Sequence, residues 1–274
     1  MTARECVIEV RGLRNQFGAQ VVHENLDLDV YKGEILGVVG GSGSGKSVLM
    51  RSIIGLNRPA AGSVRLFGRD VANLSERERS ALEQRFGVLF QNGALFSSLT
   101  VAENVMVPLR EHHDLAPALM QKLAALKIAL AGLPADAGAK YLSQLSGGMV
   151  KRAALARSLA LDPDILFLDE PTAGLDPIGA AAFDQLILTL RESLGLTVFL
   201  ITHDLDTLYT ICDRVAVLAQ KRVLVADTLD KVERFEDKWV REYFQGPRGR
   251  AAEHAAAHAG RPRDRPAAGE SAPP

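Results

Sequence analysis

The sequence lacks any run of about 18 apolar residues, the length that an α-helix needs to cross a lipid bilayer. Residues 1–10 also lack the apolar core of a secretory signal peptide. We therefore expect no membrane-spanning segment. If this protein works at a membrane, other subunits have to span it.

Neither sign of charge is in excess, and cysteine is scarce. The 32 basic and 33 acidic residues give a net charge of −1, so nothing in the overall charge favours nucleic acid or an anionic membrane surface as a partner. Cys6 and Cys212 have no spacing typical of a metal site or a disulfide framework. We expect both to be small buried residues in a reducing compartment. The 274 residues suffice for one large or two modest domains.

One glycine-rich stretch carries a specific chemistry. Residues 40–47 read GGSGSGKS and fit the pattern G-x-x-x-x-G-K-[ST]. Its glycines let successive backbone N–H groups point at phosphate oxygens, and the following helix adds the positive end of its dipole. A buried strand is expected at 35–39 and a helix from Val48. The predicted phosphate contacts are made by Gly40, Gly41, Ser42, Gly43, Ser44, Gly45, Lys46, Ser47 and Val48, with Lys46 on the β- and γ-phosphates and Ser47 on Mg²⁺.

The remaining pattern predicts an α/β protein with a helical insertion. Alternating residues at 6–13 and 21–30 indicate two half-buried antiparallel strands. Between about 97 and 161 strand signals vanish and Ala/Leu-rich helical patterns replace them. Strands are otherwise expected at 63–67, 86–90, 165–170, 197–201, 214–219 and 222–226. Helices are expected at 74–83, 150–161 and 179–194, with short helices to about 245.

Polar residues follow two of these strands. Asp169 and Glu170 end the apolar run ILFLDE, where a carboxylate would lie at the ligand-binding edge of a parallel sheet. Asp169 is placed to hold Mg²⁺, and Glu170 to polarise an attacking water. His203 follows the strand at 197–201, and the pattern leaves open whether it is structural or contacts a γ-phosphate.

Two further patterns each allow two interpretations on the residues alone. The stretch LSGGM at 145–149 offers free N–H groups at a helix start, which is also common in proteins without a ligand. Phe17 either stacks on a nucleotide base or makes a small local core contact.

Residues 246–274 are poor in large apolar residues, and we expect them to be disordered. His254 and His258 in this stretch form a metal pair only if it is helical.

Taken together, the motifs resemble one family. Phe17, GGSGSGKS, Gln91, LSGGM, ILFLDE, AGLD and His203 occur in the order found in the ATP-binding subunits of ABC transporters. The resemblance covers about residues 5–245, outside the tail at 246–274. It implies a P-loop NTPase of ABC type: a mixed RecA-like sheet core, an N-terminal antiparallel β-subdomain and an α-helical subdomain inserted at about 92–161.

The resemblance also implies roles for individual residues. Phe17 would stack on adenine, although the family more often has Tyr there, and Gln91 would sense Mg²⁺ and nucleotide. Asp169 would support Mg²⁺. Glu170 would be the catalytic carboxylate, with Lys46 and His203 also catalytic. In a dimer of two copies, Ser146, Gly147 and Gly148 would contact the ATP bound to the other copy. Asp176 would help to pair the two sites.

One departure narrows the resemblance. The family signature usually ends in Gln, whereas this chain has Met149. With the segment at 91–112 and the stretch LSGGMVKRAALARSLAL at 145–161, this change resembles the ATPases of MCE-associated, Mla-type phospholipid transporters of double-membrane bacteria. That branch implies ATP and Mg²⁺ as cofactors. Its partners would be a second copy, a transmembrane permease, an MCE-domain subunit and a STAS-domain subunit. The chain would lie peripherally on the cytoplasmic face of the inner membrane.

Two other functions share these motifs. A transporter of polar solutes would use every one of the catalytic residues. A soluble ABC-type ATPase acting on DNA or ribosomes would be expected to carry a long coiled-coil insertion or a second cassette, and the sequence has neither.

Overall fold

The computed structural model describes residues 4–246. Within them the chain forms two compact units. The first contains the described residues up to 79 and from 197 onward, and the second contains residues 80–196. None of the described helices is long and apolar enough to cross a membrane. The predictions for residues 247–274, including His254 and His258, lie outside the described residues.

An antiparallel sheet opens the first unit. It contains β1 (Cys6–Phe17), β2 (Gln20–Tyr31), β4 (Ala61–Leu66) and β5 (Arg69–Asp70), in the order β2-β1-β4-β5. Alternate residues such as Val10, Leu13 and Leu26 are fully buried, as a half-buried sheet requires. The predicted antiparallel strands are therefore confirmed, and both extend beyond the predicted ends.

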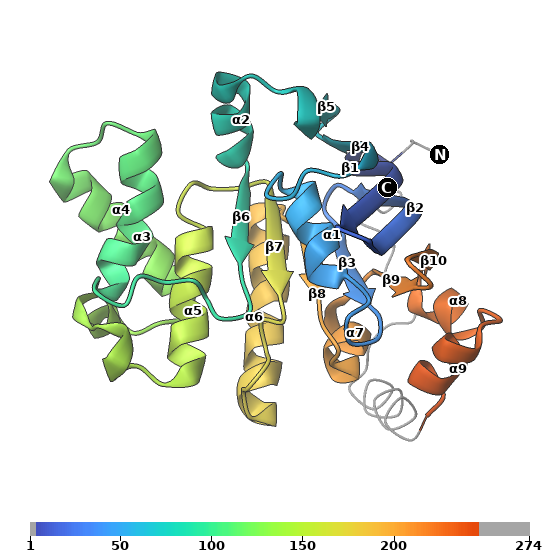
Figure 1. Cartoon of the computed structure of the whole chain (residues 1–274). Coiled ribbons are helices and arrows are strands. Elements are labelled where there is room, and N and C mark those ends of the chain that lie inside the picture. The colour runs from blue at the N-terminus through green and yellow to red at the C-terminus, as the bar shows by residue number, and fades with distance from the viewer. Residues whose placement is uncertain (1–3, 247–274) are drawn as a thin grey trace, which may run out of the picture. The chain divides into compact units, whose positions relative to one another are not determined.

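A mixed sheet forms the rest of the first unit's core (Figure 1). In it β3 (Ile35–Val39) pairs in parallel with β8 (Thr197–Ile201) and with β9 (Arg214–Ala219). The last strand, β10 (Arg222–Asp227), runs antiparallel to β9. Every residue of β3 and β8 is buried, which explains why both strands read as unbroken apolar runs.

Short helices complete this unit: α1 (Lys46–Ile53), η1 (Val71–Asn73), α7 (Leu205–Ile211), α8 (Leu229–Glu233) and α9 (Lys238–Phe244). α7 packs directly on β3. A Cβ at Gly37 would lie 2.7 Å from Leu208 Cδ2 and 2.8 Å from Cys212 Sγ, so glycine permits this close packing.

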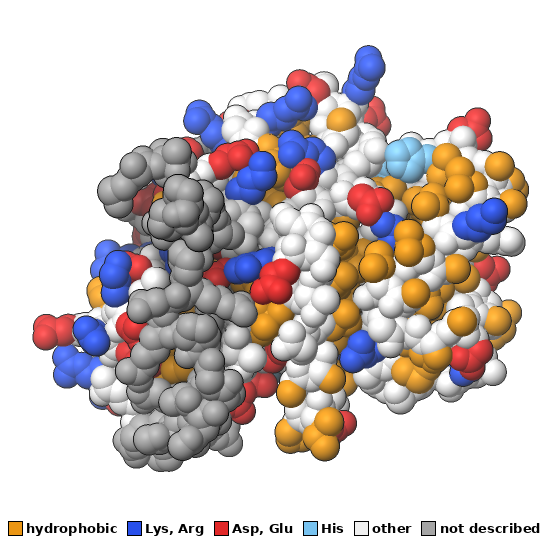
Figure 2. Space-filling model, turned by 180° about the vertical axis from the view of Figure 1, so that it is seen from behind, with side chains coloured by type: hydrophobic (Ala, Val, Ile, Leu, Met, Phe, Trp, Pro, Cys, Tyr) orange, Lys and Arg blue, Asp and Glu red, His pale blue; other side chains and the backbone are white. Residues whose placement is uncertain are grey.

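The second unit combines a strand pair with a helical part. β6 (Phe86–Leu89) pairs in parallel with β7 (Ile165–Asp169). α3 (Val101–His112), α4 (Pro117–Leu130) and α5 (Gly147–Ser158) pack on one another (Figure 1). The unit also contains η2 (Ala135–Ala139), η3 (Leu142–Gln144) and α6 (Pro177–Leu194). The helix α2 (Glu76–Glu83) begins in the first unit and ends in the second, which starts at residue 80. Figure 2 shows hydrophobic side chains gathered on the side of α3, α4 and α5.

Several local predictions differ from the structure, among them the first helix, which was predicted from Val48 and starts at Lys46. The helix predicted at 150–161 is α5, which starts at Gly147 because the Ser146 side chain accepts a hydrogen bond from Met149 N and so begins the helix earlier. Cys6 was expected to be buried, but it is only half-buried. Its thiol lies 3.6 Å from Asp29 Oδ1. Desolvation and this carboxylate together raise the pKa of Cys6 to about 11, so the thiol stays protonated and unreactive at neutral pH.

Candidate functional site

The glycine-rich loop connects β3 to α1 and is packed tightly against its own unit. A Cβ at Gly40 would lie 2.3 Å from the carbonyl oxygen of Leu218 in β9. A Cβ at Gly45 would lie 2.4 Å from His23 Nε2, and Gly45 also has a φ of +98°. Only glycine fits both places. The loop is therefore held in a conformation with its amide groups at the start of α1, where an anion binds well.

Lys46 supplies positive charge to this loop. Its Nζ donates to the carbonyl oxygens of Gly40, at 2.8 Å, and of Gly41, at 3.2 Å. Ser47 follows in the first turn of α1. The ammonium group thus lies over the loop, where it can bind phosphate oxygens.

A buried polar network of His23, Asn15 and Ser52 lies beside Gly45 of the loop, and the sequence motifs did not predict it. His23 is fully buried, and its Nδ1 lies 2.9 Å from Asn15 Nδ2. Asn15 Oδ1 lies 3.1 Å from Ser52 Oγ of α1, a hydroxyl that also lies 3.0 Å from Val48 O. The Nε2 edge of the His23 ring lies beside Gly45. Burial lowers the pKa of His23 to about 4, which keeps the ring neutral.

Two other predicted residues belong to the first unit. Phe17 ends β1 with 51% of its side chain exposed, so the ring is available for stacking. His203 follows β8 and is exposed, and its backbone carbonyl accepts a hydrogen bond from the Tyr243 hydroxyl at 3.1 Å.

In the second unit Lys151 of α5 links two predicted residues. Its Nζ donates to the carbonyl oxygen of Gln91 at 2.5 Å and to that of Glu170 at 3.1 Å. Burial lowers the pKa of Lys151, while the nearby carboxylates of Glu170 and Asp169 act in the opposite direction. The sequence motifs predicted no role for Lys151, which follows Met149 by two residues.

The two acids at the end of β7 differ in their surroundings. Asp169 is 4% exposed, which suits a carboxylate that is held in place. Glu170 has a φ of +51°, a conformation that costs a non-glycine residue about 1–2 kcal/mol. Its carbonyl oxygen accepts from Lys151 Nζ and from Ala173 N, and these bonds hold the strained turn. The backbone of Glu170 is thereby held just beyond the strand.

The predicted dimer residues lie at helix starts. Ser146 and Gly147 are exposed, and a Cβ at Gly147 would meet no atom within 4 Å. Asp176 is also exposed and caps α6 by accepting from Gly179 N at 3.0 Å. Ser146, Gly147 and Asp176 are therefore accessible at the surface of the second unit.

The residues predicted for Mg²⁺ suit that ion. The predicted set contains a single carboxylate, and nowhere in residues 4–246 do three or more His, Cys, Asp or Glu side chains gather as a metal site. Mg²⁺ is commonly held by one or two protein ligands together with phosphate oxygens and water. The buried Asp169 and the Ser47 hydroxyl are ligands of that kind. Ser47 belongs to the first unit, whereas Gln91 and Asp169 belong to the second.

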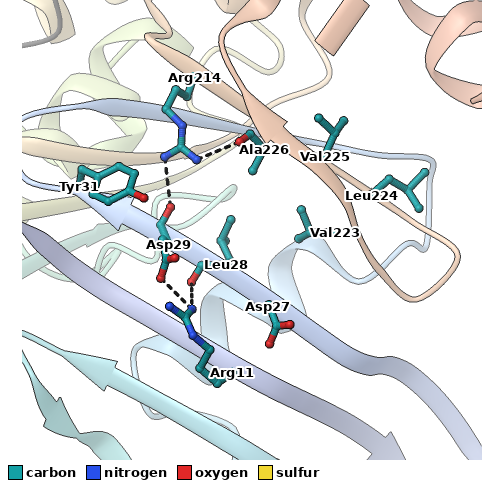
Figure 3. A pocket seen from close by; sticks show the side chains of 10 residues that line it. All are labelled: Arg11, Asp27, Leu28, Asp29, Tyr31, Arg214, Val223, Leu224, Val225 and Ala226. Carbon is teal, nitrogen blue, oxygen red and sulfur yellow. Dashed lines mark hydrogen bonds and ion pairs between the residues drawn. The ribbon is translucent and has the colours of Figure 1, made fainter. Parts of the chain in front are cut away.

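A separate cavity of about 340 Å³ lies beside the antiparallel sheet (Figure 3). Both guanidinium groups in its wall are engaged by the chain itself. Arg11 pairs with Asp29 at 2.7 Å, and Arg214 pairs with Glu34 at 2.9 Å and donates to Ala226 O. We therefore assign this cavity no ligand.

Comparisons with known proteins agree with these motifs. The family model described as ABC transporter matches residues 23–173. The phospholipid transport ATP-binding protein MlaF of Haemophilus influenzae is 38% identical over 88% of this chain and 90% of its own length. The probable ribonucleotide transport protein mkl of Mycobacterium leprae is 38% identical over 88% of this chain and 69% of its own. The methionine import protein MetN of Mannheimia succiniciproducens is 40% identical over 84% of this chain and 63% of its own.

Solved structures agree as well. A dimeric ATP-binding cassette, MJ0796, solved with ADP and Pi bound, superposes with a TM-score of 0.75 at 29% identity. The match covers 81% of this chain and 98% of that one. The mixed sheet core with an antiparallel β-subdomain is therefore the fold of such cassettes.

The link made by Lys151 can be tested by substitution. Lys151→Met keeps the aliphatic stem and removes both hydrogen bonds, so we expect the free energy of unfolding to fall by about 1–3 kcal/mol. We also expect ATP turnover to fall several-fold, because Gln91 and Glu170 lose their common anchor. Urea unfolding and steady-state phosphate release measure the two effects. Lys122→Met, an exposed change on α4, is the matched control. Wild-type stability and turnover in Lys151→Met would show that the link is dispensable.

The buried His23 predicts a specific pH dependence. Its pKa is about 4 in the folded protein and 6.5 in the unfolded chain, so the unfolded state binds the proton more readily between these values. The free energy of unfolding should therefore fall as pH drops from 6.5 to 4, by about 3 kcal/mol in total. The variant His23→Gln, which does not titrate in this range, should lack this part of the slope. Parallel pH profiles of the two proteins would contradict the assignment.

Proposed function

The chain belongs to the ABC transporter family, and from this premise we propose that its ATP hydrolysis powers the movement of a lipid, specifically a phospholipid, through a separate membrane permease. Its chemistry is that of an ABC ATPase. The substrate and the roles of individual residues are our proposal, and each is supported by a particular feature of the chain.

The proposed reaction is in-line attack of water on the γ-phosphate of ATP. The loop at 40–47 binds the phosphates through its backbone N–H groups, and Lys46 offsets the charge that develops on the γ-phosphate. Bound Mg²⁺, held by Ser47, Asp169 and Gln91, would supply further charge compensation. Glu170 polarises the attacking water, and His203 contacts the γ-phosphate. Phe17 stacks on the adenine ring.

The proposed active unit is a dimer. Ser146, Gly147 and Gly148 would contact ATP bound to the other copy, and Asp176 would help to pair the two sites. The exposure of Ser146 and the open space at Gly147 support this role. Two nucleotides would draw the copies together, and hydrolysis would let them separate.

The observation that best supports coupling to a permease is the segment after Gln91. Phe96 is 51% exposed there. Asn104 of α3 holds this segment, because its Oδ1 accepts from Phe96 N at 2.8 Å and its Nδ2 donates to Phe96 O and Leu99 O. A large apolar side chain on a fixed loop suits a protein contact. Since Lys151 links Gln91 to Glu170, movement at this contact would reach the catalytic acid.

The lipid substrate is supported by the likeness to MlaF, together with Met149 and the segment at 91–112. An MCE-domain subunit, a STAS-domain subunit and a peripheral place on the cytoplasmic face of the inner membrane belong to the same proposal. A polar solute is the alternative, favoured by the likeness to mkl and MetN, whose names indicate ribonucleotide and methionine transport.

The catalytic roles predict two contrasting variants. Lys46→Ala should lower both ATP binding and turnover, because the phosphates lose a cation. Glu170→Gln should keep ATP binding, reduce turnover by about 100-fold or more, and trap a closed dimer. Nucleotide titration, phosphate release and size-exclusion chromatography with Mg-ATP measure these effects. Normal hydrolysis by Glu170→Gln would show that another group activates the water.

The lipid proposal predicts the composition and the cargo of the native complex. Affinity purification of the tagged chain from its source membranes should recover a multispan permease and an MCE-domain protein. In reconstituted vesicles, the complex should move labelled phospholipid only with hydrolysable ATP, and the complex with Glu170→Gln should not. Recovery with a soluble amino-acid-binding protein, or ATP-driven movement of a polar solute instead of lipid, would reject the proposal.

A further inference from the structure

The last described helix, α9, carries two aromatic residues one turn apart. Trp239 and Tyr243 stack with ring centroids 4.8 Å apart and 14° between the ring planes. Val240 and Phe244 of the same helix are buried and anchor it to the first unit. Asp237 caps the helix by accepting from Trp239 N at 2.8 Å. The aromatic pair is therefore held in a fixed place.

Trp239 lies beside the phosphate loop. Its Nε1 is 3.7 Å from the position that a Cβ would occupy at Gly41, so the indole borders the space next to this glycine. Gly41 is also one of the two residues whose carbonyl oxygens hold Lys46 Nζ. A change in the loop on nucleotide binding would therefore be felt by the indole ring.

Tyr243 lies against the loop that carries His203. Its hydroxyl donates to the His203 carbonyl oxygen at 3.1 Å. The residues on either side of His203 are held by local bonds: Thr202 Oγ1 accepts from Asp204 N, and Asp204 caps α7. The bond from Tyr243 reaches His203 from another element, α9. It restricts the backbone dihedrals that set the direction of the imidazole.

We propose that Tyr243 is a positioning residue for His203, and that α9 ties this histidine to the phosphate loop through the stacked Trp239. This inference rests on the proposed role of His203 at the γ-phosphate. It assigns α9 a role in hydrolysis in addition to the packing of its buried residues Val240 and Phe244 on the first unit. Through α9 the two loops of this unit move together when nucleotide binds.

The test removes only the hydroxyl. Tyr243→Phe keeps the ring stacked on Trp239 and takes away the bond to His203. We expect kcat for ATP hydrolysis to fall about three- to tenfold, as loss of one hydrogen bond predicts, with KM for ATP within twofold of wild type. A change confined to fold stability would move the unfolding midpoint and leave kcat unaltered.

Tyr209→Phe is the matched control. It also removes a phenol hydroxyl, which bonds to Glu233 of α8. We expect it to change kcat less than Tyr243→Phe does. If both variants lower kcat equally, general loosening of the C-terminal helices explains the result and the positioning role is wrong.

A double-variant cycle separates this inference from the proposed function. His203→Ala should lower kcat more than Tyr243→Phe, and the double variant should be no slower than His203→Ala alone. If His203→Ala is slow but Tyr243→Phe is not, only the positioning role fails. If His203→Ala hydrolyses normally, the proposed role of His203 fails and the positioning role with it. Additive losses would also overturn the inference.

The contact with the phosphate loop has its own readout. Trp239 is the single tryptophan of the chain, so intrinsic tryptophan fluorescence reports this one place. We expect Mg-ATP to change its intensity or emission maximum with a midpoint equal to the Kd for ATP, and Lys46→Ala to shift that midpoint to higher concentration. Unchanged emission at saturating Mg-ATP would show that α9 does not follow the loop.

Discussion

The phosphate loop is the constraint on which the rest of the account depends. Its backbone passes so close to β9 at Gly40 and to His23 at Gly45 that no side chain fits at either place. The loop conformation is therefore set by the strands beneath it, before any ligand arrives. A loop held in this way presents its N–H groups to phosphate without a further ordering cost. Lys46 and the start of α1 add charge at the same place.

Side chains from separate helices hold the backbone of residues with proposed roles at the nucleotide. Lys151 fixes the backbone of Gln91 and Glu170, and Tyr243 bonds the backbone of His203. In each case a side chain from a separate helix contacts a backbone carbonyl oxygen. Such contacts fix direction as well as position, which catalysis requires. The strained φ of Glu170 is maintained by the same kind of bond.

Local patterns predicted the strands, the helices and the phosphate loop, because apolar periodicity and glycine placement act within a few residues. The burial of His23 was not predicted because β2 contains a bulge. His23 and Leu26 are three residues apart, whereas their partners on β1, Asn15 and Leu13, are two apart, so β2 has one extra residue. This bulge, with Asn25 at a φ of +49°, turns His23 inward against the alternation of its strand. Lys151 and Tyr243 reach carbonyl oxygens 60 and 40 residues away, and spacing within one sequence carries no signal for such pairs.

The central claim is that each ATP is held between the phosphate loop of one copy and residues 146–148 of the other. Disulfide formation tests it most directly. Mixing a Ser42→Cys chain with a Gly147→Cys chain, each with Cys6 and Cys212 replaced by Ser and Glu170 by Gln, places one thiol on each side of the expected contact. We predict a disulfide-linked pair containing one copy of each chain with Mg-ATP, and none with ADP. No cross-link at any concentration of Mg-ATP would contradict the account.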